Sequence, residues 1–392
     1  MAQDTLVSDV AVGLSRSRST ADAAREAARR AVKDLRSASI NLAYLFLSSD
    51  HLGEAGEAAQ AVRDELDPGS LLGCVSEAVI AGRRELEEGP AAAVWAASLP
   101  GAEIRAFHAT AFETDAGVEV AGLPALDEPS LVTLVADPFT FPVGPCLARL
   151  GEEHPGLPLV GGLATGGGEP GAQALVVDGE LHTEGAIGAT VTGVPVTAVV
   201  SQGCSPLGTD AVITRCEGNV VFELAGRPAL ERLRDELVAL PPAQQKLAAR
   251  GLLAGIVIDE NRSEYARGDY LMRGVLAADE KTGALALGDR VRIGQTLRFH
   301  VRDAASAHED LQETLGRLRG RPTTGALLFT CNGRGTKMFS EPDHDARLVS
   351  QVVGGSALAG FFCAGEIGPV GNRTFVHGFT ATMAVFFREV GS

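Results

Sequence analysis

The sequence contains no apolar segment long enough to cross a membrane as a helix. Its longest apolar stretches, such as residues 40–47 and 194–200, fall well short of the roughly 20 residues that a spanning helix needs. Residues 1–9 also lack the basic segment and apolar core of a secretory signal. We therefore expect a cytoplasmic protein with no membrane partner.

The chain also has fewer basic residues than acidic ones. The chain has 34 Lys and Arg residues against 50 Asp and Glu residues, which gives a net charge of −16, and it contains no dense basic run. Proteins that bind the phosphate backbone of nucleic acids need a basic surface. We therefore expect no nucleic-acid partner.

The motifs of metal and cofactor sites are missing. The six cysteines occur singly, without a CxxC pair or a CxxCH motif, and this spacing argues against zinc fingers, thioredoxin-like redox centres and covalently attached haem. The eight histidines form no known zinc pattern. We expect no cofactor, although haem held by a single axial His or Cys would leave no motif. No catalytic motif is complete, so we expect no enzyme.

Aromatic residues are scarce, at 5%, whereas glycine is abundant, at 47 residues. This combination favours close packing of small residues and many tight turns. Hydrophobic residues make up 45% of the chain, which is enough to bury a core. A length of 392 residues favours two domains.

Three segments of the chain share one order of elements, an internal repetition. Each has an apolar strand, an amphipathic helix and a second short apolar strand that contains glycine. The glycine-containing strands read LLGCVS, LVGGLA and LAGFFC, at residues 71–76, 159–164 and 358–363. Glycine inside a strand costs stability, so its return at one position indicates close backbone approach or a bulge. Packing alone, without a ligand, would also explain these glycines.

Other segments complete the predicted fold. A helix begins after Ser19, whose hydroxyl and Asp22 form an S-x-x-D capping box. Short, wholly apolar strands are typical of sheets covered on both faces. Further strands follow the second and third repeats, so the sheets should be mixed. We predict an α/β fold of repeated strand-helix-strand units, which form mixed sheets covered by helices, in two tightly packed domains at residues 1–220 and 221–392.

The most specific strings lie in the C-terminal half. Residues 325–335 read GALLFTCNGRG, residues 360–369 read GFFCAGEIGP, and residues 268–276 read GDYLMRGVL. These strings closely resemble the C-terminal domain of the FIST family, while Ser76 and the LVGG string at residues 159–162 resemble its N-terminal domain. The resemblance implies a sensory module of signal transduction that binds a small ligand such as an amino acid; some relatives are thought to bind haem. We expect the output to pass to a separate signalling partner protein.

The C-terminal strings also predict a ligand site, because α/β sheets commonly bind ligands just past the ends of buried strands. The glycines of the NGRG loop would expose backbone N–H groups, Arg334 would grip a carboxylate with two hydrogen bonds, and Glu366 would meet an ammonium group. An amino acid or another carboxylate would fit. The candidate ligand-binding residues are Cys331, Asn332, Gly333, Arg334, Gly335, Cys363, Gly365, Glu366, Arg273 and Ser205.

Two of these charged residues have a structural alternative. A salt bridge between Arg334 and Glu366 would hold two loops together without any ligand. Arg273 lies in an apolar run, where an unpaired charge is costly, so it should have a carboxylate partner such as Asp259 or Asp303.

Alternatives also remain for the other candidates. Ser205 would line a cleft between the domains or lie in a plain turn. Cys331 and Cys363 would form a reactive thiol pair if they faced each other from neighbouring strand ends, but no histidine stands in a recognisable signature for the base. An interaction scaffold without a small ligand is the remaining functional alternative.

Overall fold

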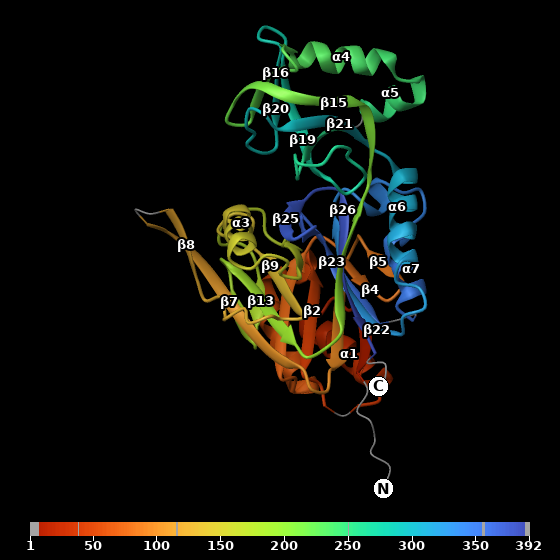
Figure 1. Cartoon of the computed structure of the whole chain (residues 1–392). Coiled ribbons are helices and arrows are strands. Elements are labelled where there is room, and N and C mark those ends of the chain that lie inside the picture. The colour runs from red at the N-terminus through yellow and green to blue at the C-terminus, as the bar shows by residue number, and fades with distance from the viewer. Residues whose placement is uncertain (1–7, 38, 115–116, 250, 355–356, 389–392) are drawn as a thin grey trace. The chain divides into compact units, whose positions relative to one another are not determined.

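A computed structural model describes residues 8–37, 39–114, 117–249, 251–354 and 357–388 (Figure 1). The chain divides into two compact units. Unit 1 comprises residues 1–200, 311–376 and 380–392, and unit 2 comprises residues 201–310 and 377–379. The predicted α/β class with mixed sheets is confirmed. The expected boundary at residue 220 stays a prediction. None of the helices described is long and apolar enough to cross a membrane.

Unit 1 contains three mixed sheets, which we call sheets I, II and III. Sheet I has the order β1 (Asp9–Ser15), β6 (Ala92–Ser98), β2 (Leu42–Ser48), β3 (Ser70–Ser76), β11 (Leu175–Val177) and β12 (Glu180–His182). Sheet II has the order β25 (Arg373–His377), β24 (Glu366–Val370), β10 (Leu159–Leu163), β9 (Leu131–Ala136), β13 (Ala186–Thr192), β7 (Glu103–Thr114) and β8 (Gly117–Ala121). Sheet III has the order β14 (Val196–Gln202), β26 (Thr380–Phe387), β22 (Thr323–Cys331), β23 (Leu358–Cys363), β4 (Val79–Ala81) and β5 (Arg84–Leu86).

The three predicted repeats are present, one in each sheet. Each repeat is a pair of parallel neighbouring strands joined by a helix, which gives β2–α2–β3, β9–α3–β10 and β22–α7–β23. The three helices are α2 (Ala55–Leu66), α3 (Val143–Glu153) and α7 (His344–Val352). Because parallel strands point the same way, the two strands of each repeat end at one edge of their sheet.

The repeated glycine has the same neighbour in each sheet. Gly73, Gly161 and Gly360 are paired in register with Leu45, Leu134 and Leu328. A Cβ atom built on these glycines would lie 2.5, 1.8 and 1.7 Å from the carbonyl oxygen of that leucine. The expected close approach of two backbones is therefore confirmed, and it leaves no room for a side chain.

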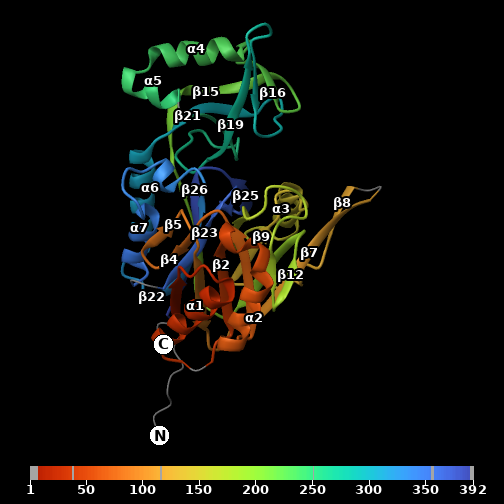
Figure 2. The ribbon, with the colours of Figure 1, turned by 180° about the vertical axis from the view of Figure 1, so that it is seen from behind.

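One hydrophobic core joins the inner faces of the three sheets. The Tyr44 hydroxyl of sheet I lies 2.7 Å from Thr133 Oγ1 of sheet II, and the rings of Phe46 in sheet I and Phe361 in sheet III have centroids 5.6 Å apart. Helices cover the outer faces: α1 (Thr20–Asp34) and α2 pack on sheet I, α3 packs on sheet II, and α7 with the C-terminal part of α6 (Ala304–Gly316) packs on sheet III. Figure 2 shows α1 and α2 in front of β2.

Helix α1 begins at Thr20, as expected, but its predicted capping box does not form. The Ser19 hydroxyl makes no cap hydrogen bond, while the Ser19 carbonyl accepts the first helical bond from the Ala23 N–H, at 2.8 Å. The helix lies against β1 so closely that a Cβ on Gly13 would be 1.8 Å from the Ala27 carbonyl oxygen. Packing of its alanine face, rather than a cap, therefore fixes this helix.

Unit 2 is built on antiparallel strands whose ladder closes into a ring. The ring order is β15 (Cys204–Glu217), β21 (Thr296–Arg302), β18 (Leu252–Val257), β19 (Tyr270–Asp279), β20 (Ala284–Leu287) and β16 (Val220–Leu224), and β16 pairs again with β15. The short β17 (Arg227–Pro228) extends from β16. Helices α4 (Ala229–Ala239) and α5 (Pro242–Ala248) pack on the apolar interior of this ring.

We predict that Gly360→Ala lowers the free energy of unfolding by about 1–3 kcal/mol, because the new methyl group collides with the Leu328 carbonyl and the strands must move apart. Gly144→Ala is the control, since Gly144 lies in α3 with no atom within 4 Å of an added Cβ. That change should leave stability the same or raise it by up to about 1 kcal/mol. Urea unfolding of both variants measures the difference, and equal stabilities would contradict the close-approach explanation.

Candidate functional site

The candidate site lies where β22 and β23 end. Their last residues, Cys331 and Cys363, are paired in register, and the Asn332 N–H donates to the Cys363 carbonyl at 2.9 Å. Strand β24 follows β23 after a short turn and begins at Glu366, which pairs with Gly162 of β10. The chain therefore passes from sheet III to sheet II at this point.

We call Cys331, Asn332, Arg334, Asp345, Cys363 and Glu366 the strand-end cluster. All of them except Asp345 belong to the predicted site, and all six belong to unit 1. Gly333, Gly335 and Gly365 lie in the same loops. Gly335, but not Gly333, has a positive φ, at +58°, and the Gly365 carbonyl accepts from the Leu163 N–H at 2.9 Å. The loops that the sequence singled out therefore lie together at the ends of neighbouring strands.

Arg334 is fully buried, and its partner is an internal carboxylate. Its Nε donates to Asp345 Oδ2 at 2.6 Å and its second terminal nitrogen donates to Oδ1 at 2.8 Å. Asp345 lies in the first turn of α7 and is 1% exposed. We expected the two adjacent nitrogens of the Arg334 guanidinium to bind a ligand carboxylate, but they bind Asp345. The alternative that we considered, a salt bridge from Arg334, does form, but its partner is Asp345 and not Glu366.

Other groups hold Asp345 in place. The Thr330 hydroxyl donates to Oδ2 at 2.9 Å, and His344 Nδ1 lies 2.8 Å from Oδ1. Burial alone would raise the pKa of Asp345, but the charge and hydrogen bonds of Arg334 outweigh it and hold this pKa below its usual value. The pair is therefore ionised, and it ties the end of β22 to the start of α7.

Glu366 is also fully buried, but only one of its oxygens is well bonded. Oε2 accepts from the Thr380 N–H at 3.0 Å and from the Thr380 hydroxyl at 2.8 Å. Oε1 makes no hydrogen bond of normal geometry with a described residue, although the Cys331 thiol lies near enough to lower the pKa slightly. Burial dominates and raises the pKa of Glu366 to about 8, so the carboxyl group is protonated at neutral pH.

A second oxygen in the cluster is in the same situation. Asn332 Oδ1 is buried and has no hydrogen-bond partner among the described residues, while the residue as a whole is partly exposed. Buried polar atoms in native proteins are nearly always paired, with protein, water or a bound molecule. Glu366 and Asn332 are therefore the residues of the cluster with hydrogen-bonding capacity left for a ligand.

Cys331 and Cys363 come together at the strand ends, as the thiol alternative requires. Burial, followed by the nearby Glu366, raises the pKa of Cys363 well above its usual value, and Cys74 of β3 lies near enough to add to this rise. Thiol chemistry needs the thiolate, so this environment opposes it.

The remaining two predicted residues belong to unit 2. Arg273 donates from Nε to Asp289 Oδ2 at 2.8 Å, so the carboxylate partner that we expected exists but is neither Asp259 nor Asp303. Asp289 follows β20, which runs beside β19, and the Gly288 N–H donates to the Gly274 carbonyl at 2.9 Å. This antiparallel pairing brings the two side chains together.

Ser205 lies in a strand rather than in the plain turn that we considered. It is the second residue of β15, and its hydroxyl donates to Asp303 Oδ2 at 3.1 Å. Asp303 also accepts from the Ser306 N–H at 3.1 Å, at the start of α6. The observed contacts of Ser205 are therefore structural.

Sequence reasoning missed Asp345, the partner of Arg334, and a second acidic residue close to Asp345. Asp345 carried no local signal, because the HDARL string reads as an ordinary first helical turn. Glu85 of β5 accepts from the Ala346 N–H at 2.8 Å, and burial, followed by the charge of Asp345, raises its pKa to about 8. Both residues reach their partners through the tertiary fold, which no sequence pattern indicates.

We predict that Asp345→Asn lowers the free energy of unfolding by about 3–5 kcal/mol, because it leaves the Arg334 charge buried without a carboxylate. The control is Glu313→Gln, which breaks the exposed pair between Arg317 and Glu313, at 2.8 Å. That variant should lose no more than about 0.5 kcal/mol. Chemical denaturation distinguishes them, and a mild effect of Asp345→Asn would show that the pair is dispensable.

A second prediction concerns pH. Because the folded-state pKa of Glu366 is raised from 4.5 to about 8, the folded protein holds a proton that the unfolded chain releases, and stability falls as pH rises across this range. One such group contributes a slope of at most about 1.4 kcal/mol per pH unit. Glu366→Gln should make the profile less steep between pH 4.5 and about 8, while Glu85, whose pKa is raised to the same value, keeps its own contribution to the slope. Urea midpoints with the wild-type pH dependence would contradict a protonated Glu366.

Comparison with known proteins identifies the family. The chain matches the FIST N domain over residues 41–227 and the FIST C domain over residues 229–369. An uncharacterized protein of Mycobacterium tuberculosis is 42% identical over 382 residues, which cover 96% of this chain and 99% of the relative. An uncharacterized protein of Mycobacterium bovis is 40% identical over 387 residues, which cover 97% of this chain and 99% of the relative. The predicted family is confirmed: the chain belongs to the FIST family, whose domains are associated with sensing in signal transduction.

Proposed function

We propose that this protein is a sensor that binds a small ligand at the strand-end cluster and passes the signal to a separate partner protein. Family membership supports the sensory role. The observation that carries the ligand site is the buried Glu366 Oε1, which makes no hydrogen bond of normal geometry with a described residue.

The free hydrogen-bonding capacity favours a ligand with N–H donors. Once Glu366 is ionised, its Oε1 and Asn332 Oδ1 are both acceptors, and neither atom makes a hydrogen bond of normal geometry with a described residue. An amino group suits both, so amino acids and simple amines are the favoured class. Arg334 contributes indirectly, since its fork is bonded to Asp345 and its role is to hold the loop in place.

The protonation of Glu366 makes binding depend on pH. An ammonium group favours the ionised carboxylate, so binding releases the proton that Glu366 holds below a pH of about 8. Affinity for an amine should therefore rise with pH up to this value. Asn332, which is partly exposed, lies on the solvent side of the cluster.

We predict that at least one amino acid or simple amine raises the melting temperature of the protein, because a ligand that binds only the folded state stabilises it. Calorimetric titration should then give a dissociation constant that falls as the pH is raised from neutral to about 8. Glu366→Gln should weaken binding at least about tenfold and remove its pH dependence, since a charged hydrogen bond contributes about 1.5–3 kcal/mol.

Glu313→Gln is the matched control, because it removes an exposed carboxylate outside the cluster. It should bind as the wild type does. A full panel without any thermal shift, or a Glu366→Gln variant with wild-type affinity, would exclude the strand-end cluster as the ligand site and favour an interaction scaffold.

A further inference from the structure

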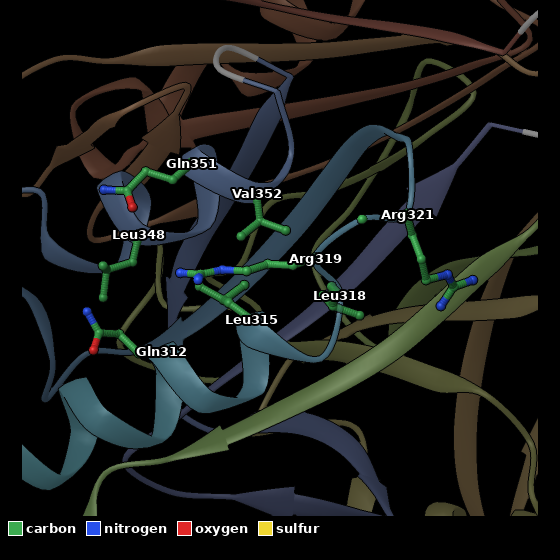
Figure 3. Close-up of a pocket in the computed structure, with 9 residues that line it drawn as sticks. Gln312, Leu315, Leu318, Arg319, Arg321, Leu348, Gln351 and Val352 are labelled. Carbon is green, nitrogen blue, oxygen red and sulfur yellow. The ribbon is translucent and has the colours of Figure 1, made fainter.

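A pocket of about 370 Å³ lies between α6 and α7 in unit 1 (Figure 3). Its size is within the range of about 300–1,000 Å³ that is typical of small-molecule sites. It is lined by the last turns of both helices and by the loop from α6 to β22. None of the six residues of the strand-end cluster lines it.

The floor of the pocket is apolar and firmly built. Leu315 and Leu318 are buried in the core cluster beneath sheet III, and Val352 packs against the same cluster. The Thr323 hydroxyl donates to the Val352 carbonyl at 2.9 Å, which fixes the end of α7 to β22. An apolar ligand chain would therefore find a preformed surface.

The polar side chains of the pocket all carry hydrogen-bond donors. Figure 3 shows the Arg319 side chain extended between Leu315 of α6 and Val352 of α7. No carboxylate of a described residue pairs with Arg319, and no acidic side chain lines the pocket within the described part of the chain. Gln312 and Gln351 stand on the two helices and present amide groups beside it.

The neighbouring charges do not cancel Arg319. On α6, Glu313 is paired with Arg317 at 2.8 Å. Arg321 adds a second positive charge, and its guanidinium carbon lies 3.6 Å from the centroid of the Phe387 ring. The pocket is thus positive in a chain whose net charge is −16.

We propose that this pocket binds a small amphipathic oxyanion, a carboxylate or phosphate monoester that carries an apolar chain. Arg319 binds the oxyanion through its hydrogen-bonding fork, Gln312 and Gln351 donate from their amides, and the chain lies on Leu315 and Val352. This site is separate from the strand-end cluster and does not rest on the function proposed for that cluster.

Calorimetric titration of the full-length protein with octanoate, octyl phosphate, 1-octanol and acetate tests the site. Octanoate or octyl phosphate should bind, and the tighter of the two identifies the head group. Acetate should not bind detectably. Hexanoate should bind about tenfold more weakly than octanoate, because two methylene groups fewer are buried. Failure of both octyl anions to bind, or equal affinity for 1-octanol, would overturn the proposal.

Variants locate the binding. Arg319→Ala should weaken octanoate binding at least about tenfold, whereas Lys33→Ala, which removes an exposed cation of α1 outside the pocket, should bind as the wild type does. Gln351→Trp places a large ring in the pocket from an exposed position and should abolish binding without disturbing the core. If Arg319→Ala and Gln351→Trp both retain wild-type affinity, the ligand binds elsewhere and the inference is wrong.

Discussion

The close approach of parallel backbones is the constraint on which unit 1 depends. In each of the three repeats, the carbonyl group of a leucine on the first strand lies where a side chain at the facing glycine of the second strand would be. Only glycine permits this approach, so each repeat pairs its strands in one register. The fixed register sets where each pair of strands ends, and in sheet III it places Cys331 beside Cys363.

Buried carboxyl groups in and near the strand-end cluster differ in protonation state according to whether a cation pairs with them. Asp345 receives both hydrogen bonds of the Arg334 fork and stays ionised. Glu85 and Glu366 lie in the same region without such a pair, and burial keeps both protonated at neutral pH. A single buried cation thus supports a single buried anion, and the other carboxyl groups serve as neutral hydrogen-bonding groups.

The sequence predicted the repeats because their signal is local. The glycine position, the apolar strands and the amphipathic helices of the repeats all follow from short-range patterns, and the structure has them with small shifts at their ends. Strands β1 and β6 escaped prediction, since short apolar segments do not distinguish strand from helix. The ion-pair partners of the charged residues were harder to predict than the strands.

Arg273 required a carboxylate, but the choice of Asp289 follows from the pairing of β19 with β20. Arg334 likewise required an anion, and Asp345 supplies it because α7 starts beside the end of β22. Such choices depend on tertiary placement, which sequence spacing does not contain.

Helix α7 belongs to both regions of interest. Its first turn carries Asp345, and its last turn carries Gln351 and Val352 at the pocket. Because a helix of 9 residues moves largely as one body, a displacement of its first turn would also displace the pocket residues on its last turn.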